Sequence, residues 1–298
     1  MTAPAGSAEP APTPELPAPA GSAPLPGHVW VNGRLVPSGT PVLPVSDRAF
    51  QVGDGVFETI RVCGGRILEQ SLHVARLAAS AAALEIPLPD DLESTLREAI
   101  AELLAADALV APGLEVSVRV TVSRGTVEGR SLLPPRNVRP AIVVQAWPVA
   151  PPSPELLSRG LHIAISRIRR DPHSPLAAVK TTSRAEFVHA RLEARRVDAD
   201  DALFLTTDGH LAEATSASLF LVRRGAELLT PALDCGILAG TTREWLIGWA
   251  PSAGLAVREA WLLPDELFAA DEAFLASSVA GVMPVTMVDG RPIGDGLP

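Results

Sequence analysis

The segment Pro148–Pro154, PVAPPSP, holds four prolines in seven residues and interrupts regular secondary structure near the middle of the chain. Proline donates no backbone hydrogen bond and fixes its own φ angle, so neither a helix nor a central strand can run through such a segment. The segment therefore predicts a linker at 148–154 between a small N-terminal domain, residues 27–147, and a larger C-terminal domain, residues 155–298. Residues 1–26 carry eight prolines and no hydrophobic periodicity, which predicts a disordered tail.

For one strand of the N-terminal half, the sequence indicates which residues lie on each of its two faces. Leu114–Ser123 alternates strictly, with four valines on one face and Ser117, Arg119 and Thr121 on the other. Alternation of this kind is typical of a half-buried strand. The other elements expected in this half are hairpins around Asn32-Gly33 and Gly64-Gly65, helices over Glu69–Leu84 and Asp91–Ala106, and a buried strand over 141–147.

Two helix starts are predicted in the C-terminal half from capping-box spacing. Ser183 and Glu186 predict a helix that begins just after Lys180 and runs to about Arg196, and Thr241 with Glu244 repeats the spacing. The other elements expected here are strands over 161–168, 202–207, 218–222 and 272–278, and a hairpin around Asp289-Gly290.

Composition excludes several classes of partner. The formal charge is −9 and the sequence pI is about 5.2, which argues against nucleic acid and against an anionic membrane surface. Two cysteines without a C-x-x-C or Cys/His cluster indicate neither a disulfide framework nor a metal site. The longest uncharged run, 273–288, is too short to span a bilayer and predicts a buried strand-turn-strand. Without a basic, apolar leader, the chain is expected to be cytoplasmic.

Lys180 is the only lysine in the chain, and the other 24 basic side chains are arginine. The two residue types differ most where the amine must lose its proton, because a guanidinium stays charged and cannot act as a nucleophile. One interpretation is the chance survival of a surface lysine. The other is a catalytic amine, which requires a cofactor or substrate pocket elsewhere in the chain.

Several other residues are candidates for binding an anion or a cofactor. In Gly236–Arg243, GILAGTTR, a glycine and two threonines precede a helix, so the segment is either an anion site or an ordinary capped helix. Ser277-Ser278 follow an apolar strand as further donors. Arg76 lies on a predicted helix and either faces solvent or makes a bidentate phosphate contact. Glu213 lies between two predicted strands, exposed in a turn or directed into a pocket.

Several motifs follow one another along the chain: DRAFQVGDGVFETIRVCGGRI, HVARLAASAAAL, Lys180, HLAEATSASLFLV, ILAGTTR and PVTMVDGRPIGDG. Together they resemble the fold-type IV pyridoxal-phosphate enzymes, from about His28 to the C-terminus. That family holds D-amino-acid and branched-chain aminotransferases and aminodeoxychorismate lyases. The resemblance implies an α+β fold of two domains: a small N-terminal α/β sandwich-like domain, and a larger C-terminal domain with a pseudo-barrel of mostly antiparallel strands. It also implies a homodimer.

The resemblance implies a role for each candidate. Lys180 would hold pyridoxal 5′-phosphate as a Schiff base and then move a proton between substrate and cofactor. Glu213 would face the pyridine nitrogen and keep it protonated. The phosphate would be bound by side chains and backbone of Arg76, Gly240, Thr241, Thr242, Ser277 and Ser278.

Substrate residues are implied less directly. Phe57 would line the substrate side, and the loop VSRGTVEGRSLLPP offers Arg124 and Arg130 for the substrate carboxylate, with Arg130 the better match. D-amino-acid enzymes commonly have a histidine where this chain has Leu132. The chain has no tyrosine, so Arg184 is a candidate replacement donor, unless it is an exposed helix arginine.

The favoured interpretation is transamination between an amino acid, such as D-alanine, and a 2-oxo acid. Aminodeoxychorismate lyase activity is the first alternative, and branched-chain L-amino-acid transamination is the second. A non-catalytic binding module on the same fold is a hypothesis of another class.

Overall fold

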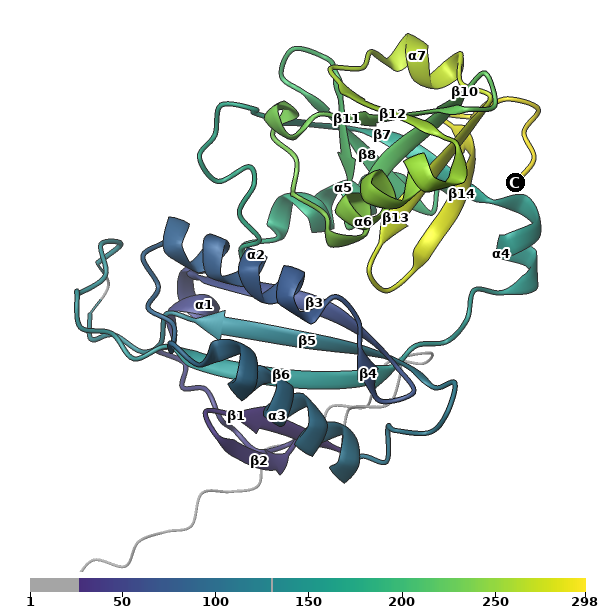
Figure 1. Ribbon diagram of the computed structural model, residues 1–298. Helices are drawn as coiled ribbons and strands as arrows, with labels where there is room; N and C mark the ends of the chain where they lie inside the picture. Colours follow the sequence, from purple (N-terminus) through teal and green to yellow (C-terminus); the bar gives the residue numbers. More distant parts are fainter. Residues whose placement is uncertain (1–26, 130) are drawn as a thin grey trace, which may run out of the picture.

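The computed structural model describes residues 27–129 and 131–298 and contains two β-sheets (Figure 1). A six-stranded sheet, in the order β2-β1-β6-β5-β3-β4, is built from residues that precede the proline-rich segment, and a nine-stranded sheet from residues that follow it. The predicted tail, residues 1–26, lies outside the described residues. We call the parts on either side of Pro148–Pro154 the N-terminal and C-terminal units.

The N-terminal sheet is antiparallel throughout. Asn32 and Gly33 have φ angles of +48° and +85°, the left-handed conformation that a two-residue hairpin requires, so the predicted hairpin is confirmed. The hairpin at Gly64-Gly65 is also confirmed. The strands are β1 (His28–Val31), β2 (Arg34–Pro37), β3 (Gly55–Cys63), β4 (Arg66–Ile67), β5 (Glu115–Ser123) and β6 (Ala141–Pro148).

Two helices cover one face of this sheet, α2 (Gln70–Ala83) and α3 (Leu92–Ala106) (Figure 1). Both were predicted within a residue at each end. The four valines of β5 are fully buried beneath them, so the predicted apolar face is confirmed. A short helix, α1 (Arg48–Val52), precedes β3.

Six strands of the C-terminal sheet close into a barrel. Following the pairings around the ring gives β10-β13-β14-β7-β8-β9, and Glu213 of β9 pairs with Ser218 of β10 to close it. Four of the six pairings are antiparallel and two are parallel, which confirms the pseudo-barrel that the family resemblance implied. The ring strands are β7 (Leu161–Arg170), β8 (Asp201–Thr206), β9 (Leu211–Ala214), β10 (Ser218–Arg223), β13 (Glu272–Ser277) and β14 (Gly281–Val288).

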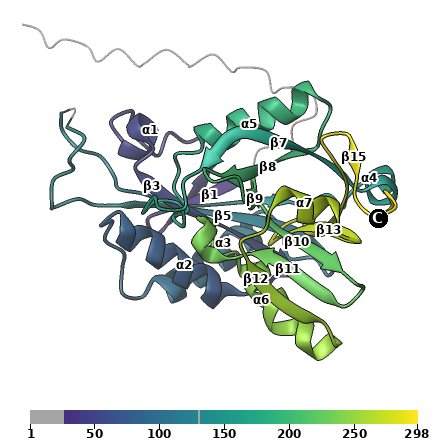
Figure 2. The ribbon, with the colours of Figure 1, turned by 90° about the horizontal axis from the view of Figure 1, so that it is seen from above.

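The remaining strands extend the barrel and helices cover it (Figure 2). No described helix is long and apolar enough to cross a membrane.

The predicted hairpin at Asp289-Gly290 joins β14 to β15 and is confirmed. These remaining elements are β11 (Glu227–Pro231), β12 (Ala256–Ala260), β15 (Arg291–Pro292), α4 (Pro154–Arg159), α5 (Ala185–Arg196), α6 (Thr241–Trp249) and α7 (Pro264–Phe268), with single 3₁₀ turns at Leu233–Cys235 and Ala250–Ala253.

Both predicted capping boxes are wrong, although both helices exist. The N-cap of α5 is Arg184 and that of α6 is Gly240, and neither helix has a side-chain cap. Glu186 instead accepts a hydrogen bond from Arg170 (2.9 Å). The Thr241 hydroxyl lies 3.0 Å from the Ser278 hydroxyl. Tertiary partners therefore bind two of the four side chains that local spacing had assigned to capping, Glu186 and Thr241.

Candidate active site

Lys180 lies in the loop between β7 and α5, and this loop is attached to the N-terminal unit. The Phe57 N–H donates to the Lys180 carbonyl (3.0 Å), and the Lys180 N–H donates to the Ser80 hydroxyl (3.2 Å). The Lys180 amine, Nζ, lies 4.7 Å from the centroid of the Phe57 ring. Burial lowers the pKa of Lys180 to about 8, with Glu58 opposing the shift. The amine is therefore far easier to deprotonate than an exposed lysine.

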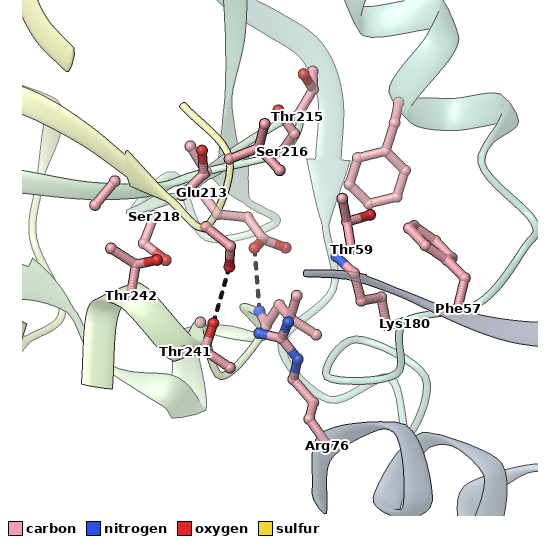
Figure 3. Close-up of a pocket in the computed structure, with 18 of the residues that line it drawn as sticks. Phe57, Thr59, Arg76, Lys180, Glu213, Thr215, Ser216, Ser218, Thr241 and Thr242 are labelled. Atoms are coloured by element: carbon pink, nitrogen blue, oxygen red, sulfur yellow. Dashed lines mark hydrogen bonds between the residues drawn. The ribbon is translucent and has the colours of Figure 1, made fainter. Parts of the chain in front are cut away.

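The amine faces a cavity of about 470 Å³ that lies between the two units (Figure 3). A cavity of this size fits a small cofactor together with part of a substrate. The view shows Thr241, Thr242 and Ser218 at one end, Lys180 with Phe57 at the other, and Arg76 directed toward the cavity from α2.

The start of α6 places hydrogen-bond donors at one end of the cavity. Because Gly240 has no capping side chain, the first backbone N–H groups of α6 remain available, and a helix N-terminus attracts negative charge. The hydroxyls of Thr241 and Ser278 lie together there, and Thr242 and Ser277 also line the cavity. A Cβ at position 240 would lie 2.7 Å from the Ser218 hydroxyl, so a larger residue there would have to displace the Ser218 side chain.

Arg76 joins α2 of the N-terminal unit to this end of the cavity. Its Nε and Nη2 each donate to the Glu58 carboxylate at 2.7 Å, and its Nη1 donates to the Ala239 carbonyl at 2.7 Å. Glu58 is fully buried and also contacts His73 Nδ1 (2.8 Å). Burial alone would raise the pKa of Glu58, but the hydrogen bonds from Arg76 and His73 hold it at about 2. The guanidinium is thus fixed by a permanent anion.

Glu213 is a buried residue of β9 that lines the cavity, so the interpretation of an exposed turn carboxylate is wrong. Its Oε2 accepts a hydrogen bond from the Leu238 N–H (3.2 Å), and its Oε1 lies 3.3 Å from Arg170 Nη2. Burial raises the pKa of Glu213, and the positive charge of Arg170 opposes that rise.

Two arginines flank Phe57 on the side of the cavity near Lys180. The guanidinium carbon of Arg119 lies 3.9 Å from the Phe57 ring centroid, and that of Arg184 lies 5.8 Å from it and 3.2 Å from the Phe187 centroid. Arg184 therefore lines the cavity and is not a solvent-exposed helix arginine. Burial lowers the pKa of Arg119, and it lowers the pKa of Arg184 to about 10. Among the described residues neither guanidinium pairs with a carboxylate, so both can bind one.

Arg124, a predicted carboxylate ligand, lies elsewhere. Its guanidinium is buried against Asp54 (2.7 Å) and donates to the carbonyls of Leu84 and Glu85, just after α2. These partners occupy its donors, so this expectation is corrected: Arg124 supports the end of α2 and does not line the cavity of its own chain. Arg130, the other candidate of that loop, lies outside the described residues.

All other predicted site residues come together in this cavity, but several lining residues were missed. Ser117 and Arg119 lie on the face of β5 opposite the valines, and Thr59 lies on the same face of β3 as Phe57. The alternation of 114–123 placed Ser117 and Arg119 on one face but gave no sign that this face borders a site. Arg170, Thr215 and Ser216 also line the cavity, and Glu58 and His73 support it from behind. All of these except Arg170 lie within the quoted motifs, but the sequence assigned none of them a role.

A buried amine, a helix N-terminus and a buried carboxylate in one cavity define a class of enzyme that binds an anionic cofactor covalently. The sequence matches the family described as amino-transferase class IV over residues 55–288, and the chain belongs to that family. The protein is therefore an enzyme of the pyridoxal-phosphate-dependent aminotransferase group, and pyridoxal 5′-phosphate is its cofactor.

Known relatives differ in activity. The chain is 30% identical to the D-alanine aminotransferase of Bacillus licheniformis, covering 91% of each protein. It is also 30% identical to the aminodeoxychorismate lyase of Vibrio harveyi, covering 86% of this chain and 90% of the lyase. The T.th. branched-chain amino acid aminotransferase, solved with pyridoxamine 5′-phosphate, superposes with a TM-score of 0.83 at 29% identity, covering 93% of this chain and 90% of that one.

The residues of the cavity fit the cofactor. The start of α6 and the hydroxyls of Thr241 and Ser278 offer uncharged donors where a phosphate needs them, and Arg76 adds a positive charge. Lys180 supplies an amine of lowered pKa. Glu213 supplies a buried acceptor for a ring nitrogen.

Proposed function

We propose that this protein transfers an amino group between an amino acid and a 2-oxo acid, with a D-amino acid such as D-alanine as the donor. The observation that carries the proposal is the position of Lys180, a buried amine between the start of α6 and two arginines that pair with no carboxylate among the described residues. The motif VSRGTVEGRSLLPP and the D-alanine aminotransferase relative favour the D-amino acid.

Pyridoxal phosphate, when bound, carries the amino group and accepts the electrons released at the substrate Cα. With the cofactor bound, the Lys180 amine would take the proton from the substrate Cα as a general base and deliver it to C4′ of the cofactor as a general acid. A pKa of about 8 suits both roles near neutral pH, because neither form of the amine is then strongly disfavoured.

Glu213 holds the proton of the ring nitrogen, because an ionised carboxylate favours a positively charged neighbour. The phosphate would be held by Arg76, the backbone of Gly240, and the hydroxyls of Thr241, Thr242, Ser277 and Ser278. Phe57 packs against the substrate side of the site.

Arg119 and Arg184 hold the substrate carboxylate. An arginine and a carboxylate form charge-assisted hydrogen bonds, and these are stronger where water is excluded. Both guanidiniums stack on aromatic rings, which fixes their direction before substrate arrives. Because the chain has no tyrosine, Arg184 is the side chain that we propose as the hydrogen-bond donor on this side of the site.

We further propose a homodimer located in the cytoplasm. The support for the dimer is family resemblance together with exposed apolar side chains, of which Phe50 and Leu133 are 77% and 83% exposed. Sedimentation of the holoenzyme at micromolar concentration tests it, and a mass of one chain would contradict it.

A half-reaction panel tests the function. The cofactor-loaded protein is mixed with D-alanine, L-alanine, L-leucine, a simple primary amine or aminodeoxychorismate, and conversion of the cofactor to its amino form is followed by absorbance. We expect the fastest conversion with D-alanine. Release of 4-aminobenzoate from aminodeoxychorismate would establish the lyase instead, and faster conversion with L-leucine would establish the branched-chain activity.

A further inference from the structure

Arg170, the last residue of β7, makes contact with the carboxylate of Glu213. Its Nη2 lies 3.3 Å from Glu213 Oε1, while the Leu238 N–H donates to Oε2 from another direction. Arg170 is itself buried, with 9% of its surface exposed. Buried ion pairs are screened by salt much less than exposed ones, so the charge of Arg170 acts on this carboxylate.

The hydrogen bonds of Arg170 go to two loops that lead into the site and to α5, whereas its contact with Glu213 is an ion pair. Nη2 donates to the Ala177 carbonyl (2.7 Å), three residues before Lys180, and to the Gly236 carbonyl (3.3 Å), four residues before Gly240. Nη1 donates to Glu186 in the first turn of α5 (2.9 Å). One guanidinium therefore joins the Lys180 loop, the loop before α6 and the Glu213 carboxylate.

The other charges near Glu213 cannot replace this contact. Arg170, Lys180 and Arg184 are the positive groups that act on its carboxylate. Lys180 loses its proton near pH 8, and Arg184 donates to the Thr215 carbonyl. Arg170 is thus the permanent cation in direct contact with the Glu213 carboxylate.

We propose that Arg170 is a positioning residue that holds the Glu213 carboxylate ionised and in place, and that couples it to the loops that lead to Lys180 and Gly240. The inference rests on the role proposed above for Glu213 as the acceptor for the cofactor ring nitrogen. It assigns Arg170 no contact with substrate.

A double-mutant cycle tests the coupling through cofactor affinity, which does not depend on turnover. Apoprotein is prepared for the wild type, Arg170→Gln, Glu213→Gln and the double variant, and the Kd for pyridoxal 5′-phosphate is measured by equilibrium dialysis. We expect Arg170→Gln to raise Kd by about tenfold or more, because the buried Glu213 carboxylate loses the cation that lies 3.3 Å from it. In the Glu213→Gln background the same change should have a much smaller effect.

The pH dependence of Kd gives a second readout. Burial raises the pKa of Glu213 and Arg170 opposes that rise, so removal of the cation moves the protonation of Glu213 to higher pH. The acid-side loss of affinity should therefore begin at higher pH in Arg170→Gln than in the wild type, and Arg170→Lys should lie between them. Arg167→Gln, on the same strand with a side chain 82% exposed, is the matched control and should change neither readout.

Each outcome decides a separate point. If Glu213→Gln alone leaves Kd and its pH profile unchanged, the proposed role of Glu213 fails. If Glu213→Gln weakens binding but Arg170→Gln weakens it equally in both backgrounds, the coupling is absent and the inference about Arg170 is overturned. Should Arg170→Gln fail to fold by circular dichroism, the cycle is run with Arg170→Lys, and additive effects there overturn it as well.

Discussion

Lys180 shows how one side chain gains reactivity from its surroundings. An exposed lysine stays protonated until near pH 10.5, whereas burial in this cavity lowers the pKa of Lys180 to about 8. The carboxylates of Glu58 and Glu213 limit the shift, and Arg76 and Arg184 add to it. The amine therefore keeps a proton to donate and loses it readily enough to attack a carbonyl carbon.

Covalent capture of pyridoxal phosphate by the apoprotein should follow this pKa. Only the neutral amine attacks, so the capture rate should rise by about tenfold per pH unit below pH 8 and level off above it. Stopped-flow absorbance measures the rate. Lys180→Ala should remove covalent capture and lower transamination by roughly a hundredfold to ten-thousandfold. A rise that continues to pH 10.5 would show that the amine is not buried in the apoprotein.

At the scale of elements, the two faces of β5 have different roles: one packs in the core and the other lines the cavity. Val118 is fully buried against the helices, while Arg119, the next residue, lines the cavity. Val118→Ala should cost about 2 kcal/mol of unfolding free energy through lost burial and a cavity, and should leave KM nearly unchanged.

Arg119→Gln should have the opposite effect. Loss of a charge-assisted contact should raise KM for the 2-oxo acid by about tenfold or more, with little change in unfolding free energy. Urea denaturation and steady-state kinetics on both variants give the comparison. Equal KM values for Arg119→Gln and the wild type would remove Arg119 from the substrate site.

Helix α6 offers a matched pair of glycines, one at each end. A Cβ at Gly240, the N-cap, would lie 2.7 Å from the Ser218 hydroxyl, whereas a Cβ at Gly248, in the last turn, would meet nothing within 4 Å. Gly240→Ala should therefore cost about 1–3 kcal/mol of stability and weaken cofactor binding. Gly248→Ala should add about 0.5–1 kcal/mol, because alanine favours the helix. Thermal denaturation and cofactor titration distinguish them, and equal cofactor affinity in both variants would contradict the phosphate site.

For the molecule as a whole, Arg76 and Glu58 connect the two units. Glu58 holds Arg76 from β3, and Arg76 donates to the Ala239 carbonyl of the C-terminal unit. The pKa of Glu58 is lowered from 4.5 to about 2 in the folded protein, so the folded state favours its ionised form. The stability that this ionisation provides is fully present above pH 4.5 and is lost as pH falls toward 2.

The unfolding free energy of the wild type should therefore fall by up to about 3 kcal/mol between pH 4.5 and 2 because of this group. Glu58→Gln should be less stable than the wild type at pH 7 and should lack this part of the acid slope. Glu98→Gln, on the exposed side of α3, is the control and should keep the slope. Urea denaturation at a series of pH values measures it, and parallel slopes for Glu58→Gln and the wild type would contradict the assignment.

Local chemistry was enough to predict most elements. Turn geometry predicted the hairpins at Asn32-Gly33 and Asp289-Gly290, and hydrophobic periodicity predicted α2, α3 and the apolar face of β5. Both signals depend on only a few neighbouring residues. The solitary lysine also drew attention to Lys180, because arginine cannot perform its chemistry. The motifs around it led to the family and the cofactor.

The tertiary structure decided which side chains meet. Glu186 and Thr241 had capping spacing, yet they contact Arg170 and Ser278 instead, and Arg124 pairs with Asp54 and not with a substrate. Arg119 and Arg170 became site residues only because the two units enclose one cavity. Burial, which lowers the pKa of Lys180 and opposes the ionisation of Glu213, depends on that enclosure and cannot be obtained from neighbours along the chain.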